Sequence, residues 1–240
     1  MEENVFRFKR FSVSHGESSM KVGVDAVLLG AWTKKETPGS ILDVGTGCGV
    51  IALMLKQRYP DAEVVGVDID EKSVAEAGFN FQNSGFEGAL EAKMMQFPSD
   101  LIDSGKKYDL IVSNPPYFQA GVQNPVTPRE RARHQDLLSV FTLIGHAPAL
   151  LNPKGVLSMI FPTEFYERIV VDAEHKGLWV KRVCRIRNND NRPEKRTMIE
   201  LLFDPNEEEP EPEYESLTLF EGGEPTLKYR NLCKDFYLKF

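Results

Sequence analysis

Cysteine is scarce in this chain of 240 residues, and its scarcity argues against two classes of protein. The three cysteines, Cys48, Cys184 and Cys233, are odd in number and lack the close spacing of metal ligands. Small folds held by disulfides need paired cysteines, and zinc sites need closely spaced cysteine or histidine ligands. We therefore expect reduced thiols and no metal site.

Long apolar runs are also missing. No apolar stretch approaches the roughly 20 residues that cross a membrane, and the first residues are acidic where a secretion signal would be basic. We expect no membrane partner and a cytoplasmic location. The length suits a single α/β domain over residues 1–240, and the sequence does not indicate an oligomeric state.

Basic residues do not outnumber acidic ones either, since the net charge is −7. However, residues 204–215 hold seven acids and no base, which accounts for the whole net charge. We expect this proline-containing stretch to be a mobile acidic insertion. Bases gather in residues 181–196, so local patches describe the partners of this chain better than its net charge does.

A short apolar strand at residues 108–113 ends in the sequence Asn-Pro-Pro-Tyr. Because proline has no backbone N–H, Pro115 and Pro116 take the chain out of the sheet at the carboxyl end of the strand, where ligands bind in open α/β sheets. There the side-chain carbonyl of Asn114 and the backbone carbonyl of Pro115 offer two acceptors to a planar amino group. Tyr117 adds an aromatic face for a base. A rigid turn capped by Asn114 is the alternative interpretation.

Residues 40–53 read as a strand, a glycine-rich turn and the start of a helix. The glycines alternate in this turn, at Gly45, Gly47 and Gly49. Glycine permits a crowded or left-handed backbone, so a ligand can lie directly against the loop. The next strand ends at Asp68, about 20 residues later, where a carboxylate can accept both hydroxyls of a ribose. This spacing favours a nucleoside site over the alternative of a strained structural turn.

With Asp43 before the glycines and Asp68 after them, the chain resembles the class I S-adenosylmethionine-dependent methyltransferases. The resemblance implies a Rossmann-like α/β fold: a seven-stranded, mostly parallel sheet with an antiparallel last strand and helices on both faces. It also implies S-adenosyl-L-methionine as the cofactor, with Asp43 and the glycine loop against its methionine part and Asp68 on its ribose. Gln96 stands where the family often has an acid for the adenine, and Asn114 completes the donor site.

In these enzymes Asn-Pro-Pro-Tyr marks methylation of an amino or amide nitrogen, which implies catalytic roles for residues 114–117. Several further segments resemble the bacterial tRNA adenine-N6 methyltransferases that modify the adenosine beside the anticodon of valine tRNA. These segments are residues 11–13, 21–32, 131–135 and 234–240. A release-factor glutamine N5-methyltransferase and a ribosomal RNA guanine-N2 methyltransferase are the alternatives. The first normally has a separate helical domain, whereas here only an extension of strand and helix, residues 1–39, precedes the glycine loop.

A tRNA partner presents phosphates, and arginines are the residues expected to meet them. Candidates for RNA binding lie in the long loop after the proline motif and between the last two expected strands: Arg129, Arg131, Arg133, Arg192 and Arg196. Solvated charges are the alternative interpretation of the arginines in the long loop. In the extension, Asp25 is expected to cap a helix that runs to Trp32.

Overall fold

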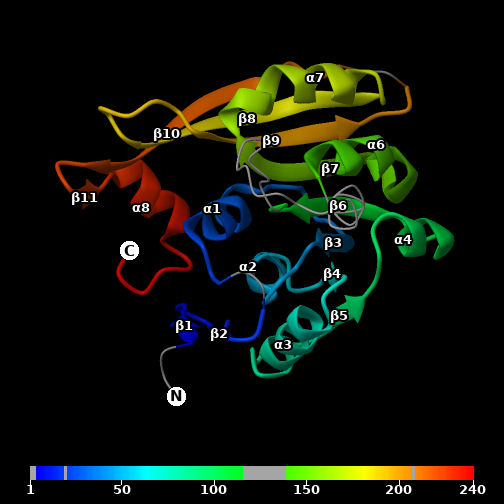
Figure 1. Cartoon of the computed structure of the whole chain (residues 1–240), viewed down its shortest axis with the longest axis horizontal. Helices are drawn as coiled ribbons and strands as arrows, with labels where there is room; N and C mark the ends of the chain where they lie inside the picture. The colour runs from blue at the N-terminus through cyan, green and yellow to red at the C-terminus, as the bar shows by residue number, and fades with distance from the viewer. Residues whose placement is uncertain (1–3, 19–20, 116–138, 207–208) are drawn as a thin grey trace, which may run out of the picture.

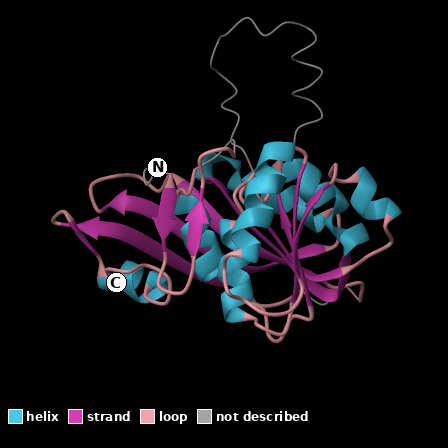
Figure 2. Cartoon of the chain, turned by 90° about the horizontal axis from the view of Figure 1, so that it is seen from below, coloured by secondary structure: helices cyan, strands magenta, loops and turns pink. Residues whose placement is uncertain are grey.

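A computed structural model describes residues 4–18, 21–115, 139–206 and 209–240 of the chain (Figure 1). Its centre is a single nine-stranded sheet with the strand order β11-β10-β8-β9-β7-β6-β3-β4-β5. These strands are β3 (Ser40–Val44), β4 (Glu63–Asp68), β5 (Leu90–Met94), β6 (Tyr108–Ser113), β7 (Leu151–Pro162), β8 (Leu178–Asn189), β9 (Arg196–Phe203), β10 (Glu213–Glu221) and β11 (Glu224–Pro225). Figure 2 shows them side by side in one twisted sheet.

The order of the strands confirms the expected fold. β5, β4, β3, β6 and β7 pair in parallel, and β9 runs antiparallel between β7 and β8. These seven strands form the predicted sheet with its antiparallel last strand. Two further strands extend it, since β10 pairs in parallel with β8, and β11 pairs with β10.

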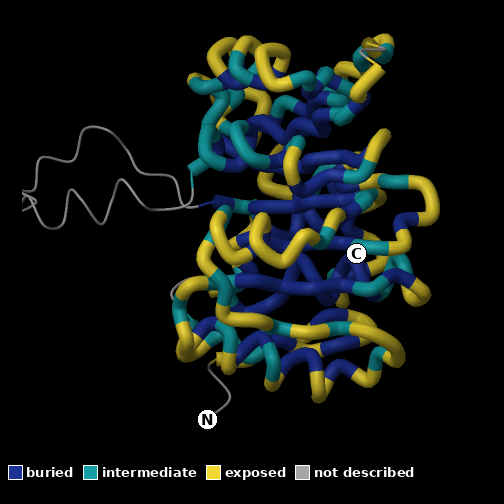
Figure 3. The backbone as a smooth tube through the Cα atoms, turned by 90° about the vertical axis from the view of Figure 1, so that its right-hand side faces the viewer, coloured by how far each residue is buried: buried dark blue, intermediate teal, exposed yellow. Residues whose placement is uncertain are grey.

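Helices cover both faces because successive side chains of a strand point to opposite sides. In β3, Ile41 belongs to one buried cluster and Leu42 to the other. The first cluster packs against α1 (Val24–Trp32), α2 (Val50–Arg58), α3 (Glu71–Gln82) and α8 (Leu227–Cys233). The second packs against α4 (Ser99–Asp103), α6 (Val140–Leu150) and α7 (Tyr166–Glu174), which follows the short 3-10 helix η1 (Thr163–Phe165). The central strands are accordingly buried, whereas the outer turns of the helices are exposed (Figure 3).

The two ends of the described chain lie together on the side of α1 to α3 (Figure 1). A small hairpin, β1 (Val5–Arg7) and β2 (Ser12–Ser14), precedes α1. Phe8 stacks on Tyr237, and the amine of Lys9 donates to the backbone oxygens of Lys234, at 2.5 Å, and Phe240, at 2.7 Å. Aromatic packing and these hydrogen bonds attach the end of the chain to the domain.

The start of α1 differs from the expectation. The cap residue is Gly23, whose neighbour Val24 opens the helix, and no side chain caps its backbone. Asp25 lies in the first turn instead and forms an ion pair with Arg196, 171 positions later in the sequence. A distant guanidinium therefore takes the carboxylate that the local rule assigns to the cap.

The acidic stretch 204–215 is partly in regular structure. Its last three residues belong to β10, and its first, Asp204, is buried and accepts a hydrogen bond from the backbone N–H of Asn206 at 2.9 Å. That the remainder is mobile stays a prediction. None of the described helices has the length and apolar character that a membrane crossing requires.

Candidate active site

The predicted donor-site residues that the structure describes lie at one edge of the sheet, where parallel strands end together. Asp43 of β3 lies opposite Val112 of β6 on one side and Gly66 of β4 on the other. Asn114 comes two residues after Val112, and Asp68 comes two residues after Gly66. They therefore flank the loop after β3 from the two neighbouring strands, roughly 10 Å apart at two strand spacings.

The glycine loop is attached to β4 through backbone hydrogen bonds. The N–H groups of Gly45 and Thr46 both donate to the carbonyl of Val67 in β4, at 2.9 and 3.0 Å. Gly47 has a φ of +53°, and a Cβ placed on it would meet no heavy atom within 4 Å. At Gly49, with a φ of +81°, a Cβ would lie 2.4 Å from the ring of Phe81. Glycine is thus required for packing at Gly49, while at Gly47 it leaves an open face for a ligand.

Asp43 is fully buried beneath this loop. Its Oδ2 accepts from the hydroxyl of Thr46 at 2.7 Å and from the backbone N–H of Ala52 at 3.2 Å, which joins the strand, the loop and α2. Its Oδ1 is buried and has no partner in the described structure. Burial raises the pKa of Asp43 to about 7, against the lowering effect of the two hydrogen bonds, and the charge of Asp68 adds to the rise. A buried oxygen without a partner is a candidate acceptor for a cationic or N–H-bearing ligand group.

Asp68 closes the other side of the loop. Its Oδ2 accepts from the backbone N–H of Gly47 at 2.9 Å, and its Oδ1 accepts from that of Asp70 at 3.0 Å. A carboxylate has about four acceptor positions, so lone pairs remain for two hydroxyls of a ligand. The side chain is half-buried and can reach a ligand that lies on the loop.

At the end of β6, the hydroxyl of Ser113 donates to the carbonyl of Val44 at 2.7 Å and fixes this strand end to that of β3. Asn114 is half-buried and Pro115 is buried, next to the glycine loop. Both acceptors of the amino-group hypothesis thus lie beside the proposed donor site. Pro116 and Tyr117 fall outside the described residues, as do Arg129, Arg131 and Arg133.

Comparisons with known proteins decide which family this site belongs to. The family model described as methyltransferase small domain matches residues 18–173. A Parabacteroides distasonis protein named tRNA1(Val) (adenine(37)-N6)-methyltransferase is 39% identical over 240 residues, with both chains covered completely. A protein of the same name from Vibrio vulnificus is 35% identical over 98% of this chain and 95% of its own.

The chain belongs to the tRNA1(Val) (adenine(37)-N6)-methyltransferase family.

Solved structures agree with this family at the level of the fold. A crystal structure titled as a predicted O-methyltransferase from Agrobacterium tumefaciens covers 88% of this chain and 96% of its own, with a TM-score of 0.64 and 17% identity. The ribosomal protein L11 methylase from Lactobacillus delbrueckii covers 75% of this chain and 77% of its own, with a TM-score of 0.52 and 18% identity.

For this member of the family, the structure indicates two candidate residues for the donor site that the sequence interpretation missed, Ile69 and Met94. Ile69 follows Asp68 directly, and its side chain is 62% exposed at the carboxyl end of β4. Met94, which pairs with Asp68 at the end of β5, is 64% exposed. Two exposed apolar side chains beside Asp68, the carboxylate predicted to bind a ribose, suit the face of an adenine ring. An isoleucine between two aspartates is the sequence signal that could have indicated Ile69.

Gln96 lies just after β5, on the same edge. Its backbone N–H donates to Oδ2 of Asp100 at 2.9 Å, and its side chain is exposed. An adenine contact by Gln96 stays a prediction. Cys48, within the glycine loop, is buried, and burial raises the pKa of its thiol to about 12. A thiol of this pKa is protonated near neutral pH and unsuited to act as a nucleophile.

Arg192, in the connection between β8 and β9, and Arg196, the first residue of β9, also lie on this edge. Arg196 pairs across the ladder with Pro162 at the end of β7, and Ser113 pairs with Met159 of the same strand. Arg196 on β9 is two strand spacings from Asn114 across β7, and it lies two residues further along the strand direction. These steps place Arg196 roughly 12 Å from Asn114. No group of three or more potential metal-ligating residues occurs within the described ranges.

Proposed function

We propose that this protein transfers a methyl group from S-adenosyl-L-methionine to the N6 amino group of adenosine 37 in tRNA1(Val). The observation that carries this function is the placement of Asn114 and Pro115 beside the glycine loop, opposite Asp68, in a chain that aligns over its whole length with relatives of that name. The tRNA and the position of the nucleotide come from the names of those relatives.

The donor fits the residues that surround the loop. Asp68 has lone pairs for the ribose, the open face of Gly47 leaves room against the backbone, and Ile69 offers an apolar surface to the adenine. The unpaired Oδ1 of Asp43 supplies a buried acceptor beneath the loop, on the side assigned to the methionine part. Bound there, S-adenosyl-L-methionine supplies a methyl group on a positively charged sulfur.

The acceptor half of the site acts by positioning. The side-chain oxygen of Asn114 and the backbone carbonyl of Pro115 would each accept one hydrogen of the adenine amino group. Holding both hydrogens draws the nitrogen lone pair out of conjugation with the ring and aims it in one direction. Tyr117 is proposed to stack on the flipped adenine, and Pro116 to keep the turn rigid. The amino group is already neutral, so no residue needs to remove a proton before the transfer.

The function is tested by incubating the protein with labelled donor and either an unmodified valine tRNA transcript or release factor and ribosome fractions. Nucleoside analysis should find N6-methyladenosine in the tRNA, and replacing adenosine 37 by guanosine should abolish labelling. A label on a release-factor glutamine, or on guanine N2 of ribosomal RNA, would assign one of the two alternative functions instead.

A further inference from the structure

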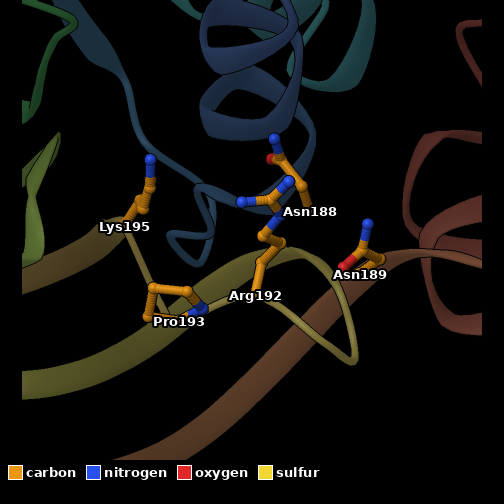
Figure 4. Close-up of a pocket in the computed structure, with 5 residues that line it drawn as sticks. All are labelled: Asn188, Asn189, Arg192, Pro193 and Lys195. Carbon is orange, nitrogen blue, oxygen red and sulfur yellow. The ribbon is translucent and has the colours of Figure 1, made fainter.

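We propose that the hairpin joining β8 and β9 forms a binding pocket for one backbone phosphate of the substrate RNA, close to the target adenosine. The proposal rests on the proposed function, because it assumes an RNA substrate at Asn114. The hairpin surrounds a hollow of about 320 Å³, lined by Asn188, Asn189, Arg192, Pro193 and Lys195. Figure 4 shows the side chains of Asn188, Arg192 and Lys195 extending to the same side of the hairpin.

Four of the five residues that line the hollow carry side-chain N–H donors, and none of the five is an acid. Within the described part of the chain, neither the Arg192 guanidinium nor the Lys195 amine takes part in a hydrogen bond or an ion pair, and both residues are exposed. Of the two acids in the hairpin, Glu194 pairs at 2.8 Å with Arg187 on the strand before the turn, and Asp190 is not among the residues that line the hollow. Two unpaired cations on one short loop suit a phosphate, whose oxygens only accept.

Arg196 already has partners within the protein. It forms an ion pair with Asp25 of α1 and donates to Oδ1 of Asn188. Since a guanidinium can only donate, it must hold the oxygen of the Asn188 amide, and the NH₂ group of Asn188 remains as a donor. We therefore assign Arg196 as a positioning residue that orients Asn188 and anchors the hairpin to α1.

Hydrogen bonds within the protein fix the backbone of the hairpin. The N–H of Arg192 donates to the carbonyl of Asn189 at 3.1 Å, and that of Lys195 to Ile186 at 3.0 Å. The carbonyl of Lys195 accepts from Thr163 at 3.0 Å, which connects the hairpin to the end of β7. The pocket is thus attached to the same strand ends that carry the active site, so it can set the distance between a bound phosphate and the target base.

That distance suits a phosphate near the target nucleotide. Arg196, at the base of the hairpin, lies roughly 12 Å from Asn114 by strand spacing. A flipped base places its amino group several ångströms from its own backbone, so a phosphate of the target nucleotide or of an immediate neighbour can reach the hollow. A contact of this kind fixes register on the RNA and carries no sequence information.

The first experiment measures RNA binding and initial methylation rates for the double variant Arg192→Ala/Lys195→Ala. The KM for an anticodon stem-loop RNA should rise about tenfold, and the slope of log Kd against log salt should fall by about 1. The variant Arg192→Lys/Lys195→Arg keeps both charges and should stay within about threefold of wild type. Donor affinity, measured by calorimetry on each variant, checks that the fold is intact.

The matched control is Lys154→Asn/Lys176→Ala, which removes two exposed charges from the opposite edge of the sheet. Lys154 has a φ of +63°, which asparagine tolerates. This control should leave the KM for RNA and the salt slope unchanged. If the double variant of the hairpin behaves like this control while wild type methylates the RNA, the pocket is wrong and the proposed function stands. If wild type methylates no RNA, the proposed function itself fails.

A second experiment identifies the phosphate. Stem-loops that each carry one neutral methylphosphonate in place of a phosphate are bound to wild type and to Arg192→Ala/Lys195→Ala. One position near the target adenosine should weaken binding to wild type by about tenfold and leave binding to the variant unaffected. Equal losses for the two proteins at every position would overturn the proposal.

Discussion

The glycine loop after β3 and the hairpin between β8 and β9 share one edge of the sheet, but they differ in charge and in burial. Residues 43–49 and 68–70 contain three acids and no base, whereas residues 187–196 contain four bases and two acids. Around the loop the carboxylates are buried or half-buried and hydrogen-bonded to the backbone. In the hairpin, Arg192 and Lys195 are exposed.

This difference separates two ways of binding. Hydrogen-bonded groups beneath the glycine loop hold a fixed geometry and are little screened by salt, so donor affinity should depend on shape and on individual hydrogen bonds. Exposed cations act over a Debye length of about 8 to 10 Å and are screened by salt. RNA affinity should therefore depend steeply on ionic strength, and donor affinity should not.

The largest effect is expected at Asn114, which follows β6, a strand that lies between these two regions in the sheet. Asn114→Ala removes one of two acceptors for the amino group, and the misplaced lone pair should lower kcat by at least about 100-fold. Donor affinity by calorimetry should stay within about threefold. Asn152→Ala is the matched control, because the Asn152 amide donates to Asp109 at 2.8 Å at the opposite edge of the sheet. A kcat for Asn114→Ala close to that of this control would contradict the role of Asn114.

The next effect concerns the pH dependence of stability. The pKa of Asp43 is raised to about 7, above its unfolded value of 3.8, so the folded state keeps a proton that the unfolded state loses between these pH values. Asp43 therefore destabilises the fold increasingly as pH rises from about 4 to 7. The free energy of unfolding of Asp43→Asn, relative to wild type, should rise by roughly 2 kcal/mol between pH 5 and 7. Urea unfolding at pH 5, 6, 7 and 8 measures it, and a constant difference would show that the carboxyl is not perturbed.

A smaller effect is expected at Asp68. Asp68→Ala removes charge-assisted hydrogen bonds to the ribose, each worth about 1.5 to 3 kcal/mol, so donor affinity should fall at least about tenfold. Asp70→Ala provides the control, because Asp70 caps α3 by accepting from Ser73 at 2.9 Å. That variant should lose about 1 kcal/mol of stability and keep its donor affinity. Calorimetry and urea unfolding on both variants distinguish ligand binding from helix capping.

The smallest effect is expected at Ile69. Its side chain is 62% exposed, so Ile69→Ala should change the free energy of unfolding by less than about 0.5 kcal/mol. Loss of apolar contact with the adenine should weaken donor binding about threefold to fivefold. The same change at Val171, 49% exposed on α7, should leave donor affinity unaltered. Equal donor affinities for the two variants would remove Ile69 from the site.

Local signals in the sequence predicted the loop and the strand ends that meet at the candidate donor site. Alternating glycines, an acid at the end of a strand and two prolines each restrict the backbone of their own neighbourhood, and the parallel sheet then brings the strand ends together. Asp43 shows the limit of this reasoning. The resemblance to methyltransferases predicts that Asp43 lies against the donor. Its hydrogen bonds to Thr46 and Ala52, and the lack of a partner for its Oδ1, could be found only in the folded loop.

Contacts between distant segments were not predictable. Asp25 reads as a helix cap by any local rule, and its pairing with Arg196 depends on β9 lying beside β7. β10 pairs with β8 although an acidic, proline-containing stretch precedes it. The alternation of apolar and polar side chains in β10 does not indicate which strand it joins. Long-range strand pairing is decided by the completed sheet rather than by the segment itself.

The bonds between the two ends of the described chain have a consequence for synthesis. The amine of Lys9 binds the backbone oxygen of Phe240, 231 positions later, so this contact of the amino-terminal hairpin forms only after the chain has been translated to that point. At about 5 to 20 residues per second, the nascent hairpin waits on the order of ten seconds or more. During this interval Phe8, which is 4% exposed in the finished fold, lacks the ring of Tyr237. Phe8 is therefore translated early but is covered fully only when Tyr237 has been made.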